Sequence, residues 1–236
     1  MWKLLLDAVF PRKCVICHNI LNKRMTGALC SACRRQLHSV TEPRCKRCSK
    51  SLEVFEEELC GDCKGKTFYV TKGKALYSYD RMMQTAIVNF KYGGDLSCGD
   101  YFARELVKKY GTWIKEISPE VIFPVPVHKK KLRFRGFNQA EYIAAQIGME
   151  LGIPVMGDYL IRTENTRPQK GLDVRARIEN LQRSFGVIQT GRRYRNVLLV
   201  DDIYTTGATL EACGKALKET GTNRIYFLCL CIGRGD

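Results

Sequence analysis

The sequence lacks any apolar run of the ~18–20 residues that a membrane-spanning helix needs. The N-terminal stretch from Met1 to Phe10 is apolar, but it contains Asp7 and has no small-residue cleavage site, which argues against an export signal. Acidic residues are few, 24 against 39 lysines and arginines, and the formal charge is +15. We therefore expect a cytoplasmic protein with a basic surface and an anionic partner, such as a phosphate ligand, nucleic acid or an acidic membrane face.

Cysteine is abundant, with twelve in the chain. Without an export signal, this number indicates metal binding in a reducing compartment rather than disulfides. Eight of the cysteines form four CxxC pairs, and the second two pairs repeat the first two. Two CxxC turns complete a tetrahedral shell of four sulfurs, which is a closed, structural zinc site. The repeat predicts two such sites: Cys14, Cys17, Cys30 and Cys33, and then Cys45, Cys48, Cys60 and Cys63.

Other ligand arrangements compete with this sequential pairing. An interleaved cross-brace would use the same eight cysteines, and iron–sulfur ligation is a further alternative. The run from Cys14 to His18 also matches a c-type haem attachment motif. Ser49 stands where the second copy of the repeat would need that histidine, so we interpret His18 as a turn residue.

The pattern after residue 66 is that of an α/β domain. Apolar runs predict strands at 74–79, 121–125, 197–200 and 225–232, and helical periodicity predicts helices at 82–92, 100–110, 139–151 and 207–220. Strands that are apolar on both faces indicate a mostly parallel sheet with helices on both faces. The expected organisation is a double zinc-ribbon-like module at 1–66 and an α/β domain at 67–236.

The most informative stretch runs from Val197 to Leu210. An apolar strand leads to Asp201 and Asp202, and a turn of small and hydroxylated residues then opens a helix. Backbone N–H groups at a helix N-terminus favour an anion, and Gly207 allows a close approach of the backbone. Two adjacent carboxylates suit the two hydroxyls of a ribose. The stretch therefore predicts a site for a ribose 5-phosphate.

This string closely resembles the phosphoribosyl-pyrophosphate (PRPP) signature of type I phosphoribosyltransferases. The resemblance implies that Asp201 and Asp202 contact the ribose hydroxyls. It implies that a Mg²⁺ ion joins the ribose to the pyrophosphate. The 5-phosphate would be cradled by Thr205, Thr206, Gly207, Ala208 and Thr209.

A second basic segment follows the predicted strand at 121–125 and packs five cations into residues 129–135. Its position suggests a pyrophosphate loop opposite the phosphate cradle, and a solvated run of charge is the plainer alternative. The candidate residues are His128, Lys129, Arg133, Arg135, Asn138 and Gln139. A further segment, 162–180, lies where transferases of this fold carry a mobile loop over the active site.

Several motifs together resemble the competence ComF/GntX-like family, the ComFC type. They are the cysteine-rich start, Arg135-Gly-Phe-Asn-Gln139, Gln169-x-x-Leu172 with 175–180, and the Asp201 to Thr209 signature. The resemblance implies a role in natural transformation, with handling of single-stranded DNA on the cytosolic side of the uptake machinery, at the inner face of the membrane. A single strand needs a basic groove with aromatic stacking faces, for which Phe134, Phe137, Phe68 and Tyr69 are candidates.

The sequence leaves the activity open between three hypotheses. The first is a competence factor that binds PRPP or a related phosphorylated ribose. The second is an active phosphoribosyltransferase that releases pyrophosphate as a nitrogen nucleophile attacks PRPP. The third is a regulatory DNA- or protein-binding protein that reuses the fold. No pattern for recognising a nucleobase is visible in residues 74–110, and the sequence identifies no catalytic residue.

Overall fold

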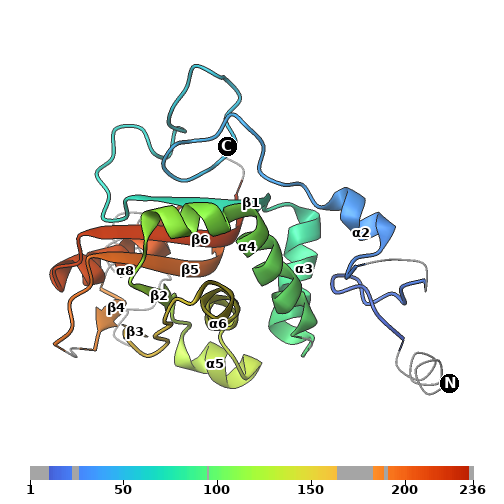
Figure 1. The fold of residues 1–236 in the computed structure, drawn as a ribbon. Coiled ribbons are helices and arrows are strands. Elements are labelled where there is room, and N and C mark those ends of the chain that lie inside the picture. Colours follow the sequence, from blue (N-terminus) through green and yellow to red (C-terminus); the bar gives the residue numbers. More distant parts are fainter. Residues whose placement is uncertain (1–10, 23–26, 95, 164–182, 189–190, 234–236) are drawn as a thin grey trace, which may run out of the picture.

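The computed structural model describes residues 11–22, 27–94, 96–163, 183–188 and 191–233 of the chain. Its centre is a four-stranded sheet in which all neighbouring strands run parallel (Figure 1). The apolar runs predicted as strands are buried on both faces, as a central parallel sheet requires. The strand order across the sheet is β1 (Lys72–Ser78), β6 (Arg224–Ile232), β5 (Asn196–Tyr204) and β2 (Val121–Pro124).

Three helices cover one face of this sheet: α3 (Arg81–Tyr92), α4 (Ser97–Ile117) and α6 (Gln139–Leu151). Phe102 and Ile143 belong there to the same core as Leu198 and Leu228 of the sheet, and all four are fully buried. Burying one such side chain stabilises the fold by ~1.5–3 kcal/mol. Apolar burial therefore holds this layer together.

The opposite face is covered by α8 (Ala208–Glu219) and by a small antiparallel hairpin. Leu210, Cys213 and Leu217 on α8 form one core with Ile225 and Phe227 of β6. The hairpin consists of β3 (Leu160–Arg162) and β4 (Phe185–Val187). Helices on both faces confirm the α/β class that the sequence predicts.

The helix bounds follow local capping chemistry. The side chain of Asn138 accepts a hydrogen bond from Ala140 N at 3.1 Å and starts α6, and Gly152, at φ 69°, ends it. Asp80 caps α3 in the same way by accepting from Met83 N at 3.0 Å. Each of these side chains pairs an N–H group at a helix end, so α3 and α6 begin where their caps stand.

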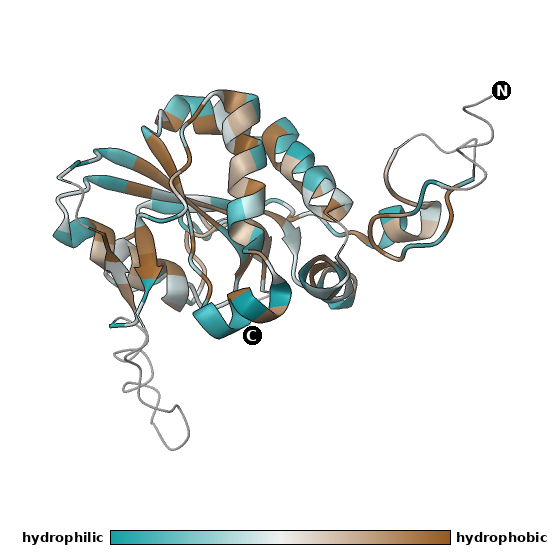
Figure 2. Cartoon of the chain, turned by 90° about the horizontal axis from the view of Figure 1, so that it is seen from below, coloured by the Kyte–Doolittle hydropathy of each residue, from teal (hydrophilic) through white to brown (hydrophobic). Residues whose placement is uncertain are grey.

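The cysteine-rich region straddles the edge of the sheet. Its middle, 38–40, pairs antiparallel with β1: Ser78 N donates to His38 O at 2.8 Å, and Val40 N donates to Leu76 O at 3.1 Å. The half before this segment contains α2 (Ser31–Gln36) and joins the core on the α3 and α4 side. The half after it joins the core on the α8 side. Figure 1 shows the second half above β1, and Figure 2 shows the first half projecting beside the sheet.

Some elements differ from the sequence prediction. The basic segment expected as a loop is a helix, α5 (Lys129–Arg135), because His128 caps it by accepting from Lys130 N at 3.1 Å and Gly136, at φ 81°, ends it. The β3–β4 hairpin has no counterpart in the prediction, since its strands are three residues long and carry little periodicity. Helix α4 extends beyond the predicted 100–110 because Ile114 and Ile117 continue its buried face.

Candidate functional site

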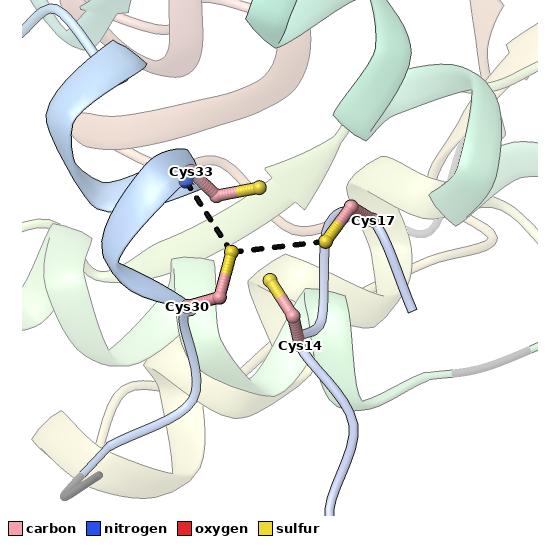
Figure 3. A group of neighbouring side chains, drawn as sticks. All are labelled: Cys14, Cys17, Cys30 and Cys33. Atoms are coloured by element: carbon pink, nitrogen blue, oxygen red, sulfur yellow. Dashed lines mark hydrogen bonds between the residues drawn. The ribbon is translucent and has the colours of Figure 1, made fainter. Parts of the chain in front are cut away.

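The eight paired cysteines form two separate four-sulfur clusters. Cys14, Cys17, Cys30 and Cys33 make one, shown in Figure 3, and Cys45, Cys48, Cys60 and Cys63 make the other. The Sγ atoms within each cluster lie within 4.8 Å of one another. Tetrahedral zinc with Zn–S bonds of about 2.3 Å separates its sulfurs by roughly 3.8 Å, and Cys17 and Cys30 lie at 3.8 Å. The sequential pairing is therefore the one present, and each cluster fits one structural zinc ion.

The two clusters sit in turns of the same construction. Cys14 N donates to Asn19 O and Cys45 N donates to Lys50 O, each at 2.8 Å. His18 (φ 57°) and Ser49 (φ 69°) occupy the same left-handed position one residue after each CxxC. This equivalence confirms the internal repeat and the interpretation of His18 as a turn residue.

The leading cysteine of each cluster has a lowered pKa, whereas burial or hydrogen bonds between the thiols raise the pKa values of Cys17, Cys33, Cys48 and Cys63. Hydrogen bonds from the Cys48 and Cys63 side chains lower the pKa of Cys45 strongly. Burial opposes ionisation of Cys14, but hydrogen bonds from the backbone N–H groups of Cys17 and Cys30 outweigh it and lower its pKa to about 7. A thiolate is the form that binds zinc.

A cavity of about 220 Å³ opens at the carboxyl ends of β2 and β5. This edge is where ligands bind in open parallel sheets. The cavity brings together residues from both predicted segments, which lie far apart in the chain. Those that line it are Asp201, Asp202, Thr205 and Thr209 from the β5–α8 turn, and Arg135, Asn138 and Gln139 from the end of α5 and the start of α6.

Other predicted residues lie near the cavity without lining it. Thr206, Gly207 and Ala208 belong to the same turn, where the Thr206 hydroxyl accepts from Ala208 N at 3.4 Å. Gly207 is required there: its φ is 77°, and a Cβ atom would stand 2.4 Å from the Tyr204 hydroxyl. His128, which caps α5, and Lys129 and Arg133 within this helix are not among the cavity residues.

Three further cations line the cavity: Lys91, Lys131 and Arg162. Lys91, in the last turn of α3, forms an ion pair with Asp202, and no local motif marks it in the sequence. Lys131 lies within the predicted basic segment but is not among its candidate residues. Arg162 opens the predicted mobile-loop segment; residues 164–182, with Arg167, Gln169, Lys170, Leu172, Arg175, Arg177 and Asn180, lie outside the described residues.

The cavity shifts the pKa values of both an acidic and a basic side chain. Burial first, and then the neighbouring Asp202 carboxylate, raise the pKa of Asp201 well above its ordinary value, although both side chains keep some exposure to the cavity. Asp201 Oδ1 accepts from Asp202 N at 2.8 Å. Desolvation, followed by the cations Arg135, Arg162 and Lys91, lowers the pKa of Lys131. A bound cation would reduce the repulsion between the two carboxylates, and a bound anion would reduce the repulsion between the cations.

Two residues that line the cavity each carry a buried donor atom for which the described residues offer no acceptor. Arg135 Nε and Gln139 Nε2 have no hydrogen-bond partner in the part of the chain that the structure describes. Arg135 Nη1 donates to Gln139 Oε1 at 3.2 Å, which holds the two side chains together at the cavity wall. Buried polar groups are rarely left unpaired unless a ligand or water completes them. The donor set therefore fits an anionic ligand.

Comparisons with known proteins bear on both halves of the chain. The double zinc ribbon domain model matches residues 5–64. Competence protein F of Haemophilus influenzae is 30% identical over 221 residues, which covers 92% of this chain and 95% of that protein. Competence protein ComFC of Bacillus subtilis is 27% identical over 82% of this chain and 79% of its own length. DNA utilization protein YhgH of Salmonella typhimurium is 24% identical over 94% of this chain and 97% of its own length.

A solved structure, the purine phosphoribosyltransferase of Pyrococcus horikoshii, matches 56% of this chain and 73% of its own length. The sequence identity is 19% and the TM-score is 0.36, a likeness too distant to carry an argument about function. Among the described residues, no helix has both the length and the apolar character needed to cross a membrane.

Proposed function

Since the chain belongs to the family of competence protein F and ComFC, we propose that it acts in natural transformation by binding PRPP or a related phosphorylated ribose. The observation that carries this proposal is the cavity at the β5–α8 turn. There Asp201 and Asp202 share the lining with a group of cations and with Arg135 and Gln139, each of which has a buried donor without a hydrogen-bond partner among the described residues. We assign the competence role from the relatives and the ligand from the cavity.

The β5–α8 turn would hold the ribose phosphate. The hydroxyls of Thr205 and Thr209 line the cavity beside the N-terminus of α8, where helix N–H groups and the helix dipole favour a phosphate. Asp201 and Asp202 would accept from the ribose hydroxyls. A Mg²⁺ ion brought with the ligand would find oxygen ligands of the kind it prefers, and it would ease the repulsion between the two carboxylates.

The α5 side of the cavity would hold the pyrophosphate. Lys131, Arg135 and Arg162 line the cavity there, and desolvation, followed by the neighbouring cations, lowers the pKa of Lys131. Lys91 would exchange its ion pair with Asp202 for the ligand phosphates. Ligand and Mg²⁺ together would thus neutralise both sides of the cavity.

A surface beside the cavity would meet single-stranded DNA. Phe134 on α5 is 79% exposed and packs edge-to-face against Tyr92, which is 53% exposed, with ring centroids 5.9 Å apart. Lys129, Lys130 and Arg133 are exposed on the same short helix. Aromatic faces among cations are what single strands bind. Phe137 packs instead in the core against Phe90, and Phe68 lies beneath the Arg47 guanidinium.

Calorimetry with PRPP tests the central proposal. The full-length, zinc-loaded chain should bind PRPP in the presence of Mg²⁺, and Asp201→Ala with Asp202→Ala should abolish the binding. The control is Asp158→Ala with Glu150→Ala, which removes two exposed acids, and so the same charge, outside the cavity. If the double variant at the cavity binds PRPP as tightly as the parent, the ribose site is wrong.

An active phosphoribosyltransferase remains the alternative use of the same cavity. A second cavity at the neighbouring strand ends, described below, favours it by offering space for an acceptor. Release of inorganic pyrophosphate from Mg²⁺–PRPP, measured with and without added nitrogen bases, separates turnover from binding alone.

A further inference from the structure

A second cavity, of about 450 Å³, opens at the carboxyl ends of β1 and β6. Ser78 ends β1 on one side of it, and Ile232 and Gly233 end β6. Strand β6 lies directly between β1 and β5, and neighbouring strands are ~4.8 Å apart. The second cavity therefore lies at the same ligand-binding edge as the phosphate cavity, one or two strands away.

The cysteine-rich region forms the outer wall of this cavity. Ser39 and Thr41 come from the segment that pairs with β1, and Ser51 and Leu52 come from the second zinc turn. That turn is held by Leu52 N donating to Pro43 O at 2.7 Å, and Thr41 N donates to Ser51 Oγ at 3.1 Å. The second zinc cluster thus fixes the position of one wall of the cavity.

A histidine–aspartate pair lies at the cavity. His38 lines it and is 58% exposed at its side chain, and its Nδ1 lies 2.6 Å from Asp80 Oδ2. Asp80 is itself held by its cap bond from Met83 N. Because a carboxylate only accepts, His38 Nδ1 is the donor, and the hydrogen bond orients the ring. Among the described residues, Nε2 has no hydrogen-bond partner, so it is available to a ligand.

The lining differs in charge from that of the phosphate cavity. Four cations surround the phosphate cavity, whereas Lys50 of the second cavity is paired with Asp62, and Glu53 supplies an opposite charge. Hydroxyls dominate the rest of the polar lining, and Leu52 and Ile232 add apolar surface. Hydrogen-bonding edges around an apolar surface suit a flat, neutral molecule with ring nitrogens.

We propose that this second cavity is a binding site for a neutral nitrogen heterocycle, held by His38 Nε2 against a wall built by the second zinc ribbon. Binding there needs no ligand in the phosphate cavity. The further role of the heterocycle, as the partner of a phosphorylated ribose at the same sheet edge, rests on the proposed function. The zinc module would then serve as a base-recognition element, for which the sequence of residues 74–110 shows no recognisable pattern.

Histidine NMR tests the site, because the chain has only three histidines. Adenine, hypoxanthine, cytosine and uracil are titrated separately into the zinc-loaded, full-length protein, with His18→Asn and His128→Asn used to assign the ring signals. At least one base should shift the His38 signals saturably and leave those of His18 in place. A cavity-filling variant, Ser39→Phe, should weaken that base at least tenfold, whereas Ser31→Phe, an exposed serine outside the cavity, should not.

Zinc content of two per chain in both serine variants shows that the fold is kept. If none of the four bases moves the His38 signals up to its solubility limit, or if Ser39→Phe binds like Ser31→Phe, the second site is overturned. A parallel titration with Mg²⁺–PRPP keeps the two ideas separate. Base binding without PRPP binding refutes the ribose site alone, and PRPP binding without base binding refutes the second site alone.

Discussion

At the scale of single residues, the cavity places charges where they cost stability. The raised pKa of Asp201 means that the folded chain holds this proton more tightly than the unfolded chain does. The stability that the group contributes is therefore present at low pH and is lost as the pH rises from the ordinary carboxyl range through the raised pKa. Binding sites commonly carry such a cost, and a ligand offsets it.

Asp201→Asn should remove this cost, because the amide is neutral and its oxygen can still accept from Asp202 N. We expect the melting temperature at pH 7 to rise by about 2–4 °C, the shift that ~1 kcal/mol produces in a chain of this size. PRPP binding should be lost in the same variant. Thermal denaturation from pH 5 to 8 provides the check, and a variant with lower stability throughout would show that Asp201 is well accommodated as an anion.

Lys131 and Lys130 offer a matched pair on one helix, since only Lys131 lines the cavity. Lys131→Ala should weaken binding of inorganic pyrophosphate by about 1.5–3 kcal/mol, roughly ten- to hundredfold, as expected for a lost hydrogen bond to a charged group. Lys130→Ala should change it little. Calorimetry measures both affinities. Equal losses of affinity would mean that α5 attracts pyrophosphate through its overall positive charge and not through a direct contact from Lys131.

At the scale of elements, the helical form of α5 separates the side chains of its basic segment into those at the cavity and those at the surface. As a helix, it turns Lys131 and Arg135 to the cavity and leaves Phe134 exposed. The same residues in a loop would carry no such separation. The element therefore links the proposed phosphate site to the proposed DNA surface.

Phe134→Ala should weaken binding of a short single-stranded oligonucleotide by about 1–3 kcal/mol, the worth of one base stacked on an aromatic ring. Phe55→Ala is the control, because Phe55 is also 79% exposed but lies in the second zinc ribbon. Fluorescence anisotropy at several salt concentrations gives the affinities, and affinity should fall steeply with added salt. Binding that ignores salt, or that responds equally to both variants, would argue against this surface.

At the scale of the whole molecule, the two zinc ribbons hold the edge of the sheet between them. Asn89 of α3 donates to Ile16 O at 2.6 Å, Gly73 N donates to Arg47 O at 2.8 Å, and the segment between the ribbons pairs with β1. Cys14 and Cys33 of the first ribbon are buried in one core, and the four cysteines of the second ribbon are buried in the other. The domain boundary at residue 66 stays a prediction. It marks a change in sequence pattern, whereas the ribbons and the α/β part pack together in shared cores.

Loss of zinc should therefore destabilise the α/β part as well as the ribbons. The parent should carry about two zinc ions per chain, Cys45→Ser with Cys48→Ser about one, and the control Cys98→Ala two, since Cys98 lies outside both clusters. The double variant should melt at least roughly 5 °C lower, because the wall along β1 is released. Metal analysis measures the zinc content, and scanning calorimetry measures the melting temperature. An α/β part whose melting temperature stays the same without zinc would mean that the two parts are independent domains.

The sequence by itself determined those features whose physics is local. Four CxxC turns specify their own metal chemistry, and apolar runs specify central parallel strands. The string from Asp201 to Thr209 specifies a turn that requires glycine at position 207. The cap at Asn138 and the end at Gly152 are likewise written in neighbouring residues. Each depends on contacts within a few positions, so a pattern in the chain is enough to reveal it.

Only the tertiary structure decided which distant groups meet. It brought Lys91 to Asp202 and set His38 against Asp80 beside a cavity between zinc ribbon and sheet. It also left buried donors of Arg135 and Gln139 without a partner among the described residues. These encounters depend on the packing of helices against strands and on the pairing of 38–40 with β1. No spacing in the chain encodes them, because their energy comes from burial and from charges that become neighbours only once the fold is complete.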